Sequence, residues 1–159
     1  MFSKRLFLES KHKTEIVLFA VILSLDLFTK ILALRFLLPR ASVQILPFFS
    51  LTYVENTGSA FGLFQNSNLF LLFVSIAVLI LMVKWRKDIL TMGKLAKYGY
   101  VLIFAGALGN IYDRIVLGYV VDFLDFHFWP VFNVADSSIC VGAALIALAF
   151  LKEEKRREK

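Results

Sequence analysis

The chain has 159 residues, the length of one ordinary domain, and 59% of them are apolar. A mean hydropathy of +0.75 and 17 Phe exclude an ordinary water-soluble globule, because so short a chain has too little interior to bury these side chains. The excess is expected to face lipid. The 18 Lys and Arg outnumber the 12 Asp and Glu, but they punctuate apolar runs as the flanks of membrane helices do, so no nucleic-acid partner is expected.

Four membrane-spanning helices are expected, at about residues 16–38, 65–84, 98–117 and 131–151. The first would measure about 34 Å, enough to cross a hydrocarbon core of ~30 Å. A cleaved signal peptide is the alternative for this segment, because basic residues precede it. No small-residue cleavage site follows, however, and the apolar stretch resumes after Asp26, which favours a retained helix.

The loop between the first two helices, residues 39–64, is too long for a simple turn. Residues 42–54 are rich in β-branched and aromatic side chains and are interrupted by Pro47, which predicts a short hairpin or curled sheet on the membrane surface. The predicted fold class is therefore a mainly α membrane protein with four transmembrane helices and a small extracytoplasmic β-region between helices 1 and 2. Residues 1–159 are expected to form a single polytopic membrane domain.

The basic residues predict the orientation. Fourteen of the 18 fall in the N-terminal segment, the link after the second helix, and the C-terminal tail. Four crossings place these three segments on one side, which the positive-inside rule identifies as the cytoplasm. Both termini are therefore expected to be cytoplasmic, and the loops at residues 39–68 and 118–130 are expected to face outward.

Ionisable residues inside spanning helices are costly and mark candidate sites. Asp26 and Lys30 stand four residues apart on one helix face, so they are predicted to form a structural ion pair. Asp113 and Arg114 are neighbours on the third helix and point in different directions. Each is expected to reach a different helix or loop, in a network that is also structural.

Three aspartates have no Lys or Arg nearby in the sequence: Asp122, Asp125 and Asp136. Asp122 follows the third helix at the outer boundary, and Asp136 lies about 7 Å below the same boundary in the fourth. These two are therefore expected at similar depths, while Asp125 is expected to be exposed or to cap a turn. Two carboxylates that share a low-dielectric site can hold one proton between them and activate water, which is aspartic protease chemistry.

Other interpretations of these residues stay open at this point. Paired carboxylates in membranes also carry protons or ions, so a small conducting bundle that uses Asp26, Asp113 and Asp136 is one rival. A scaffold subunit whose polar residues only fix helix packing is another. His12 and His127 are far apart and lack a matching carboxylate cluster, so no metal site is expected. Ser137 and Ser138 have no histidine base, which disfavours a serine triad.

Four motifs, taken together, resemble those of bacterial lipoprotein signal peptidase (signal peptidase II), an intramembrane aspartic protease family. They are Asp26-x-x-x-Lys30; Asn56-Thr57-Gly58-Ser59-Ala60-Phe61; Gly109-Asn110-x-x-Asp113-Arg114, followed by Gly118-Tyr119-Val120-Val121-Asp122-Phe123; and Phe132-Asn133-Val134-Ala135-Asp136. Each motif is weak alone. Their order along the chain makes the resemblance specific.

The resemblance implies an endopeptidase of the bacterial inner membrane. Such an enzyme removes the signal peptide of a diacylglyceryl-modified prolipoprotein by cutting just before the lipidated cysteine. The family's catalytic pair falls on Asp122 and Asp136. The positions that the resemblance makes substrate-binding or dyad-supporting are Asn56, Gly58, Asn110, Asp113, Arg114, Asn133 and Ala135. No cofactor or metal is expected, membrane lipids and the lipidated precursor are the expected partners, and the enzyme is expected to act as a monomer near the outer leaflet.

Overall fold

The computed structural model describes the backbone of residues 2–58 and 67–158, and the side chains of residues 13–58 and 67–158. The elements in these ranges are α1 (Phe2–Phe36), β1 (Ser42–Leu46), β2 (Phe49–Asn56), α2 (Asn68–Lys84), α3 (Arg86–Thr91), α4 (Lys94–Val116), β3 (Val120–Asp125) and α5 (Val134–Arg157). The expectation of a mainly helical chain with a small antiparallel sheet is confirmed.

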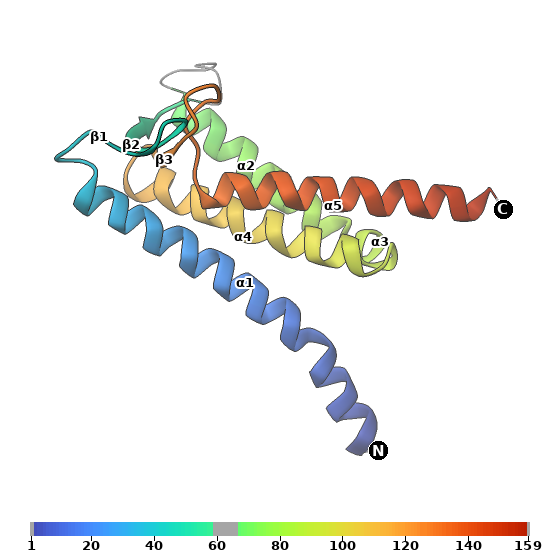
Figure 1. The fold of residues 1–159 in the computed structure, drawn as a ribbon. Helices are drawn as coiled ribbons and strands as arrows, with labels where there is room; N and C mark the ends of the chain where they lie inside the picture. Colours follow the sequence, from blue (N-terminus) through green and yellow to red (C-terminus); the bar gives the residue numbers. More distant parts are fainter. Residues whose placement is uncertain (1, 59–66, 159) are drawn as a thin grey trace.

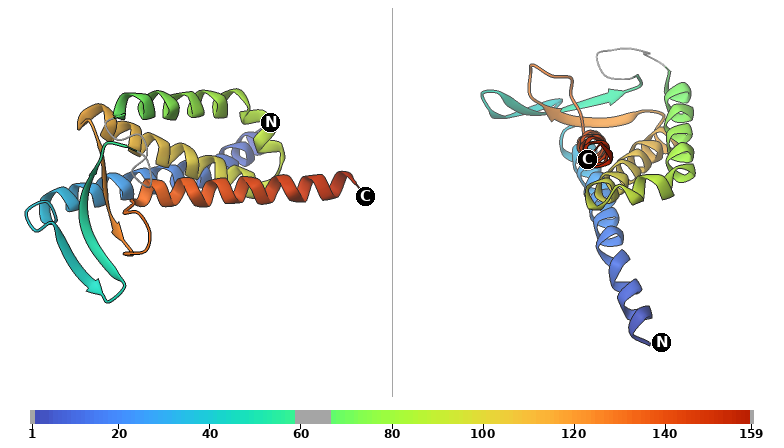
Figure 2. Two further views of the ribbon diagram at one scale, coloured as in Figure 1. Left: turned by 90° about the horizontal axis from the view of Figure 1, so that it is seen from above. Right: turned by 90° about the vertical axis from the view of Figure 1, so that its right-hand side faces the viewer.

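Helix α4 lies at the centre of the bundle and contacts α1, α2 and α5 (Figure 1). Both chain ends lie at the end of the bundle away from the sheet, and the sheet lies where α1 ends and α5 begins (Figures 1 and 2). An apolar core joins α2 to α4 through Leu79, Met82, Tyr100 and Ile111. The sheet therefore lies at one end of the helical bundle, whose helices α2 and α4 are packed together by this core.

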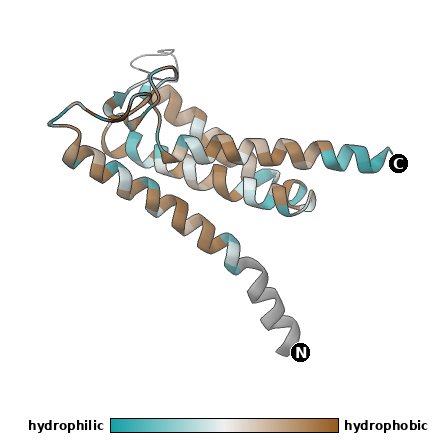
Figure 3. Cartoon of the chain, viewed as in Figure 1, coloured by the Kyte–Doolittle hydropathy of each residue, from teal (hydrophilic) through white to brown (hydrophobic). Residues whose placement is uncertain are grey.

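The outer faces of the helices are apolar. Phe73 on α2 is 67% exposed, Phe28 on α1 is 58% exposed, and Phe150 on α5 is 56% exposed. Figure 3 shows hydrophobic residues along α1, α2, α4 and α5, and a hydrophilic end to α5. Exposed rings of this size on several neighbouring helices are suited to lipid and not to water.

Two stretches in the described residues are long and apolar enough to span a bilayer, Lys13–Phe36 and Val134–Arg157. Helix α2 is apolar but has only 17 residues, and α4 carries four charged side chains, Lys94, Lys97, Asp113 and Arg114. Length and hydropathy alone therefore support two of the four expected crossings.

Helices α4 and α5 approach closely because small residues line their contact. A Cβ atom on Gly142 would lie 2.7 Å from the carbonyl oxygen of Gly99, and a Cβ on Gly99 would lie 2.6 Å from that of Gly142. Ser138 crosses the same contact and donates to the Leu102 carbonyl oxygen (3.2 Å). Small residues that allow close backbone approach are the usual means of helix packing in membranes.

The predicted hairpin is present, and a third strand that was not predicted pairs with it. β1 pairs antiparallel with β2 from Ser42↔Thr52 to Leu46↔Phe49, and β2 pairs antiparallel with β3 from Ser50↔Asp125 to Asn56↔Val120. The expectation that the β-region lies only between the first two helices is therefore corrected. The run Val120–Asp125 is rich in β-branched and apolar residues, and it gains its ladder from β2, which is distant in the sequence.

The helix limits also differ from the expected ones. α1 begins at Phe2, well before residue 16, because no Gly or Pro interrupts its polar N-terminal part. α5 begins at Val134 and not at 131, because Asn133 is extended and caps it, and it continues past residue 151 to Arg157 with Glu153 paired to Arg156 and Arg157. α2 begins at Asn68, and the expected start at residues 65–66 lies outside the described residues.

Candidate functional site

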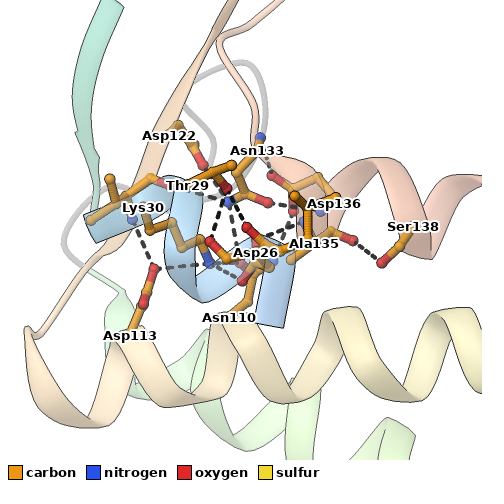
Figure 4. A network of polar contacts seen from close by, with 12 residues as sticks. Asp26, Thr29, Lys30, Asn110, Asp113, Asp122, Asn133, Ala135, Asp136 and Ser138 are labelled. Carbon is orange, nitrogen blue, oxygen red and sulfur yellow. Dashed lines mark hydrogen bonds and ion pairs between the residues drawn. The ribbon is translucent and has the colours of Figure 1, made fainter. Parts of the chain in front are cut away.

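A buried ammonium lies where α1 meets α4. Lys30 Nζ is 2.9 Å from Asp26 Oδ2 and 3.0 Å from Asp113 Oδ2, and it donates to Asn110 Oδ1 at 2.9 Å. Asp26 is fully buried and Lys30 is 2% exposed. The predicted pair of Asp26 and Lys30 is confirmed, and Asp113 joins it. We call these four residues, Asp26, Lys30, Asn110 and Asp113, the Lys30 network (Figure 4).

The Lys30 network also holds backbone from two other elements. Asp26 Oδ1 accepts the N–H of Ala135 in the first turn of α5 (2.8 Å), and Asp113 Oδ2 accepts the N–H of Val121 in β3 (3.1 Å). Close packing favours this arrangement, because a Cβ on Gly109 would overlap the Asp26 carboxylate. The network therefore joins α1, α4, β3 and α5 at one point.

Asn133 sets the start of α5 and orients its first acidic residue. Its side-chain oxygen accepts the N–H of Asp136 (2.8 Å), and its own N–H donates to Asp136 Oδ2 (3.3 Å), which together form a capping box. Asp136 is thus the third residue of the helix, at the bundle end that carries the sheet. The side-chain nitrogen of Asn133 is left to donate elsewhere.

That nitrogen donates to Asp122. Asn133 Nδ2 lies 2.7 Å from Asp122 Oδ1, and Asn56 Nδ2 donates to Asp122 Oδ2 at 2.8 Å. Asp122 is only 1% exposed. The pairing of β2 with β3 brings Asn56 beside this carboxylate, since Val54 opposes Asp122 in the ladder.

Asp136 has a second amide donor in α4. Asn110 Nδ2 donates to Asp136 Oδ1 at 2.8 Å, and Asn110 Oδ1 accepts from Lys30 Nζ (2.9 Å) and Asn133 Nδ2 (3.2 Å). Asn133 thus contacts both carboxylates, and Asn110 connects one of them to the ammonium (Figure 4). Asp122 and Asp136 lie at one site, as their similar depths predict. We call them the carboxylate pair.

The electrostatics of Asp122 reflect this environment. Burial raises the pKa of Asp122 from its ordinary value of 3.8 to about 7, and the negative charge of Asp136 adds to the rise. Hydrogen bonds from Asn56 and Asn133 and the charge of Lys30 act in the opposite direction. Because each carboxylate acts on the other, the two titrate as a unit and not as separate groups.

Arg114 is the second cation near the pair. Its charge interacts with Asp136, Asp122 and Asp113, in decreasing order. Within the described residues its Nε is buried and has no hydrogen-bond acceptor, while its backbone oxygen accepts from Asn68 Nδ2 (3.2 Å). Asp113 therefore reaches α1 and β3 while Arg114 lies toward the carboxylate pair, so the two neighbours reach different elements, as expected.

Asp125 and His127 have other partners than the carboxylate pair. Asp125 accepts from the Thr52 hydroxyl and from the His127 backbone N–H, both at 2.8 Å, so it caps the turn after β3 as expected. These two bonds outweigh the effect of its slight burial and hold the pKa of Asp125 below its ordinary range. His127 Nε2 lies 2.9 Å from the Ser50 hydroxyl. Both residues therefore serve the turn and the sheet.

The motif that begins at Asn56 is described only in part. Ser59, Ala60 and Phe61 lie outside the described residues, whereas Gly58 is described and donates its N–H to Asn56 Oδ1 (3.0 Å). In the part of the chain that the structure describes, no group of three or more His, Cys, Asp or Glu could hold a metal ion. The described site offers carboxylates, amides and two cations.

Residue spacing alone separates Asp26 and Lys30 from the carboxylate pair, whereas the family resemblance places Asn110, Asp113 and Ala135 with that pair. The structure shows the connections: the backbone N–H groups of Val121 and Ala135 and the contacts of Asn110 with both Lys30 and Asp136. A backbone donor is not revealed by the identity of its residue. Apart from the resemblance, the only sequence signal was that Val121 directly precedes Asp122 and Ala135 directly precedes Asp136.

Comparisons with known proteins give one consistent family. The sequence profile described as signal peptidase (SPase) II matches residues 18–152. The lipoprotein signal peptidase of Thermodesulfovibrio yellowstonii is 44% identical over 148 residues, which cover 89% of this chain and 97% of the relative. That of Caldanaerobacter subterraneus is 47% identical over 133 residues, which cover 82% and 91%.

Solved structures agree with the sequence matches. A bacterial membrane enzyme solved in meso at 2.3 Å resolution is similar with a TM-score of 0.77 and 33% identity, and the match covers 90% of each chain. A second, solved at 1.9 Å, gives a TM-score of 0.75 at 33% identity and covers 87% of this chain and 93% of the other. Each likeness spans most of the chain.

Proposed function

This chain belongs to the signal peptidase II family, and we propose that it uses Asp122 and Asp136 to cleave diacylglyceryl-modified prolipoproteins just before the lipidated cysteine. The family consists of proteases that cut lipoprotein signal peptides, so the chain is a protease.

One observation carries the assignment of the carboxylate pair. Asn133 donates from its side chain to Asp122 (2.7 Å) and from its backbone to Asp136 (3.3 Å), so one residue holds both carboxylates. Each carboxylate also accepts a hydrogen bond from a second amide: Asp122 from Asn56, and Asp136 from Asn110. Fixed amide donors keep the pair oriented, as a catalytic pair requires.

The proposed reaction needs one proton on the pair. The ionised carboxylate removes a proton from a water molecule as the water oxygen attacks the scissile carbonyl carbon, and the protonated carboxyl gives its proton to the carbonyl oxygen, which yields a gem-diol. The carboxyl that took the proton of the water then delivers it to the departing amide nitrogen as the C–N bond breaks, while the other carboxylate takes a proton back from a gem-diol hydroxyl. A pKa of about 7 for Asp122 is consistent with a proton shared at neutral pH.

The membrane placement follows from the charges at the two ends of the bundle. The N-terminal segment, the link that contains α3, and the end of α5 hold 13 of the 18 basic residues, and the backbone of these three segments lies away from the sheet. We therefore propose four crossings by α1, α2, α4 and α5, with both termini in the cytoplasm. The carboxylate pair then lies near the outer leaflet of the bacterial inner membrane, where a lipid-anchored peptide bond can meet water.

The buried polar groups described around the carboxylate pair lie toward the sheet end of the bundle, which argues against a proton conduit. After Ser138, α5 carries no charged residue until Lys152. A conduit needs polar groups through the whole membrane thickness.

Substitution of each carboxylate by its neutral isostere tests the proposal. We expect Asp122→Asn and Asp136→Asn each to reduce cleavage of a lipidated precursor in detergent by at least about 1,000-fold, because the pair can no longer share a proton. Asp125→Asn is the matched control, since Asp125 lies in the same strand as Asp122 and only caps a turn. Thermal unfolding checks that all three variants fold. Near wild-type cleavage by either site variant would refute the assignment.

The substrate class needs its own test. A precursor whose cysteine lacks the diacylglyceryl group should be cleaved with a much lower kcat/KM, because the lipid places the scissile bond at the depth of the pair. The same peptide with and without lipid is compared at equal detergent concentration. Equal turnover of the two peptides would rule out recognition of the lipid.

A further inference from the structure

Lys30 is enclosed by three partners. Its Nζ donates to Asn110 Oδ1 (2.9 Å) and lies at ion-pair distance from Asp26 Oδ2 (2.9 Å) and Asp113 Oδ2 (3.0 Å). Its side chain is only 3% exposed, so a substrate does not reach the ammonium. Any effect of Lys30 on the reaction must therefore pass through these three partners.

Each partner holds a different part of the carboxylate pair. Asp26 accepts the N–H of Ala135, the residue before Asp136. Asp113 accepts the N–H of Val121, the residue before Asp122. The third partner, Asn110, donates directly to Asp136 Oδ1. One ammonium thus sits between the supports of both carboxylates, which come from β3 and α5.

We propose that Lys30 is the positioning residue of the carboxylate pair: it fixes the Asn110 amide toward Asp136 and, through Asp26 and Asp113, the backbone that carries both carboxylates. This inference rests on the proposed function, because it requires Asp122 and Asp136 to be the catalytic groups. It gives Lys30 a role beyond helix packing.

The Asn110 amide shows how the ammonium acts. Its oxygen faces Lys30 and its nitrogen faces Asp136, so a flipped amide would turn an acceptor toward the carboxylate and a donor toward the ammonium. Asn133 Nδ2 also donates to that oxygen, but at the longer distance of 3.2 Å. Loss of the ammonium removes the charged and shorter of the two hydrogen bonds that the Asn110 oxygen accepts.

The charges around Lys30 predict a change in pH dependence as well. Asp26 faces it from α1, Asp113 from α4, Asp122 from β3 and Asp136 from α5, and Arg114 is the other cation near the pair. The charge of Lys30 lowers the pKa of Asp122. Without it the pair takes up its proton at higher pH, so the pH optimum of cleavage moves upward.

Lys30→Met removes the charge and keeps most of the length. We expect kcat to fall about 10- to 100-fold, with KM within about twofold of the wild-type value, because the pair is misplaced while substrate contacts remain. The pH optimum should rise. Lys30→Arg keeps the charge, and its optimum should stay at the wild-type pH. A folded Lys30→Met enzyme with wild-type kcat and pH optimum would overturn the inference.

Lys30→Met leaves two buried carboxylates without their cation, and breaking a buried ion pair in this way is strongly destabilising. The double variant Asp26→Asn with Lys30→Met lessens this cost, because the net charge of the network is unchanged and the oxygen of the introduced amide can still accept the Ala135 N–H. If Lys30 only neutralises Asp26, this variant cleaves at the wild-type rate and the inference fails. A folded double variant with kcat at least about 10-fold lower supports it.

The Asp122→Asn and Asp136→Asn variants separate this inference from the proposed function. If both are inactive while folded Lys30→Met is fully active, the catalytic pair stands and only the role of Lys30 is refuted. If either carboxylate variant is active, the proposed function itself fails, whatever the Lys30 variants do.

Discussion

The side-chain nitrogen of Asn56 lies 2.8 Å from Asp122 Oδ2, which ties the end of β2 to the carboxylate on β3. The amide orientation is fixed from the other side, because Asn56 Oδ1 accepts the N–H of Gly58 at 3.0 Å. The last residue of β2 therefore donates to a buried carboxylate whose pKa lies near neutrality.

Asn56→Ala should move the pH dependence of cleavage. The hydrogen bond from Asn56 lowers the pKa of Asp122, so its loss raises that pKa by about one unit, since a hydrogen bond to a charged group is worth about 1.5–3 kcal/mol. The pH–rate profile should shift to higher pH by about one unit, because the pair then keeps its shared proton to higher pH. An unchanged profile would show that Asn56 does not act on the catalytic protonation state.

The same contact shows what the sequence made predictable. Asp122 and Asp136 were expected together because they stand at the facing ends of two neighbouring segments, and the structure agrees. The pairing of β3 with β2 was not predicted, because the run Val120–Asp125 is too short to distinguish a strand from a turn without knowing its partner. That partner was the predicted hairpin strand, which carries Asn56.

Asp122 should also give the folded chain a pH-dependent stability. Burial first and Asp136 second raise its pKa in the folded state from 3.8 to about 7. A raised carboxyl pKa means that its stabilising contribution is fully present below pH ~4 and is lost as the pH rises to about 7. The loss amounts to at most about 4 kcal/mol, from about 1.4 kcal/mol per pKa unit.

Thermal unfolding in detergent between about pH 4 and pH 8 measures this effect. The wild type should lose melting temperature over this range, and Asp122→Asn should lose much less. The slope is the readout, because the asparagine amide also meets donors from Asn56 and Asn133 and lowers stability at every pH. Equal slopes for the two proteins would show that Asp122 ionises normally in the folded chain.

Two glycines of α4, Gly109 and Gly99, allow the effect of helix packing to be distinguished from the effect of site geometry. A Cβ on Gly109 would overlap the Asp26 carboxylate, whereas a Cβ on Gly99 would meet Gly142 and Ile146, away from the Lys30 network. Both Gly→Ala variants should lose about 1–3 kcal/mol of stability by overpacking. We expect only Gly109→Ala to lower kcat per folded molecule, by about 10-fold. A similar kcat for both variants would contradict the link between Asp26 and the site.

The limits of the helices were less predictable than their approximate positions. Charged residues ended the expected fourth helix at 151, but Lys152 to Arg157 continue α5 because Lys, Glu and Arg are good helix formers. The polar start of α1 was missed for the same reason. Hydropathy detects where a helix can contact lipid, and helix propensity decides where it ends, so the two limits need not coincide.

The Arg114 guanidinium has a donor, Nε–H, that we expect to bind the substrate. Its Nε is buried and lacks an acceptor in the described residues, and a buried unsatisfied donor costs about 1–3 kcal/mol. A substrate backbone carbonyl that has lost its water is the acceptor we expect. Arg114→Lys keeps the charge but loses the Nε–H and the planar fork, so KM should rise about 10-fold while the pH optimum stays constant.

Steady-state kinetics on the lipidated precursor test this, with Asp125→Asn as the unaffected reference. If Arg114 acted only through its charge on the carboxylate pair, Arg114→Lys would retain the wild-type KM, and Arg114→Ala would shift the pH optimum upward by removing a nearby cation. If Nε binds substrate, both variants raise KM. The comparison of lysine with alanine at this position therefore distinguishes a substrate donor from an electrostatic support.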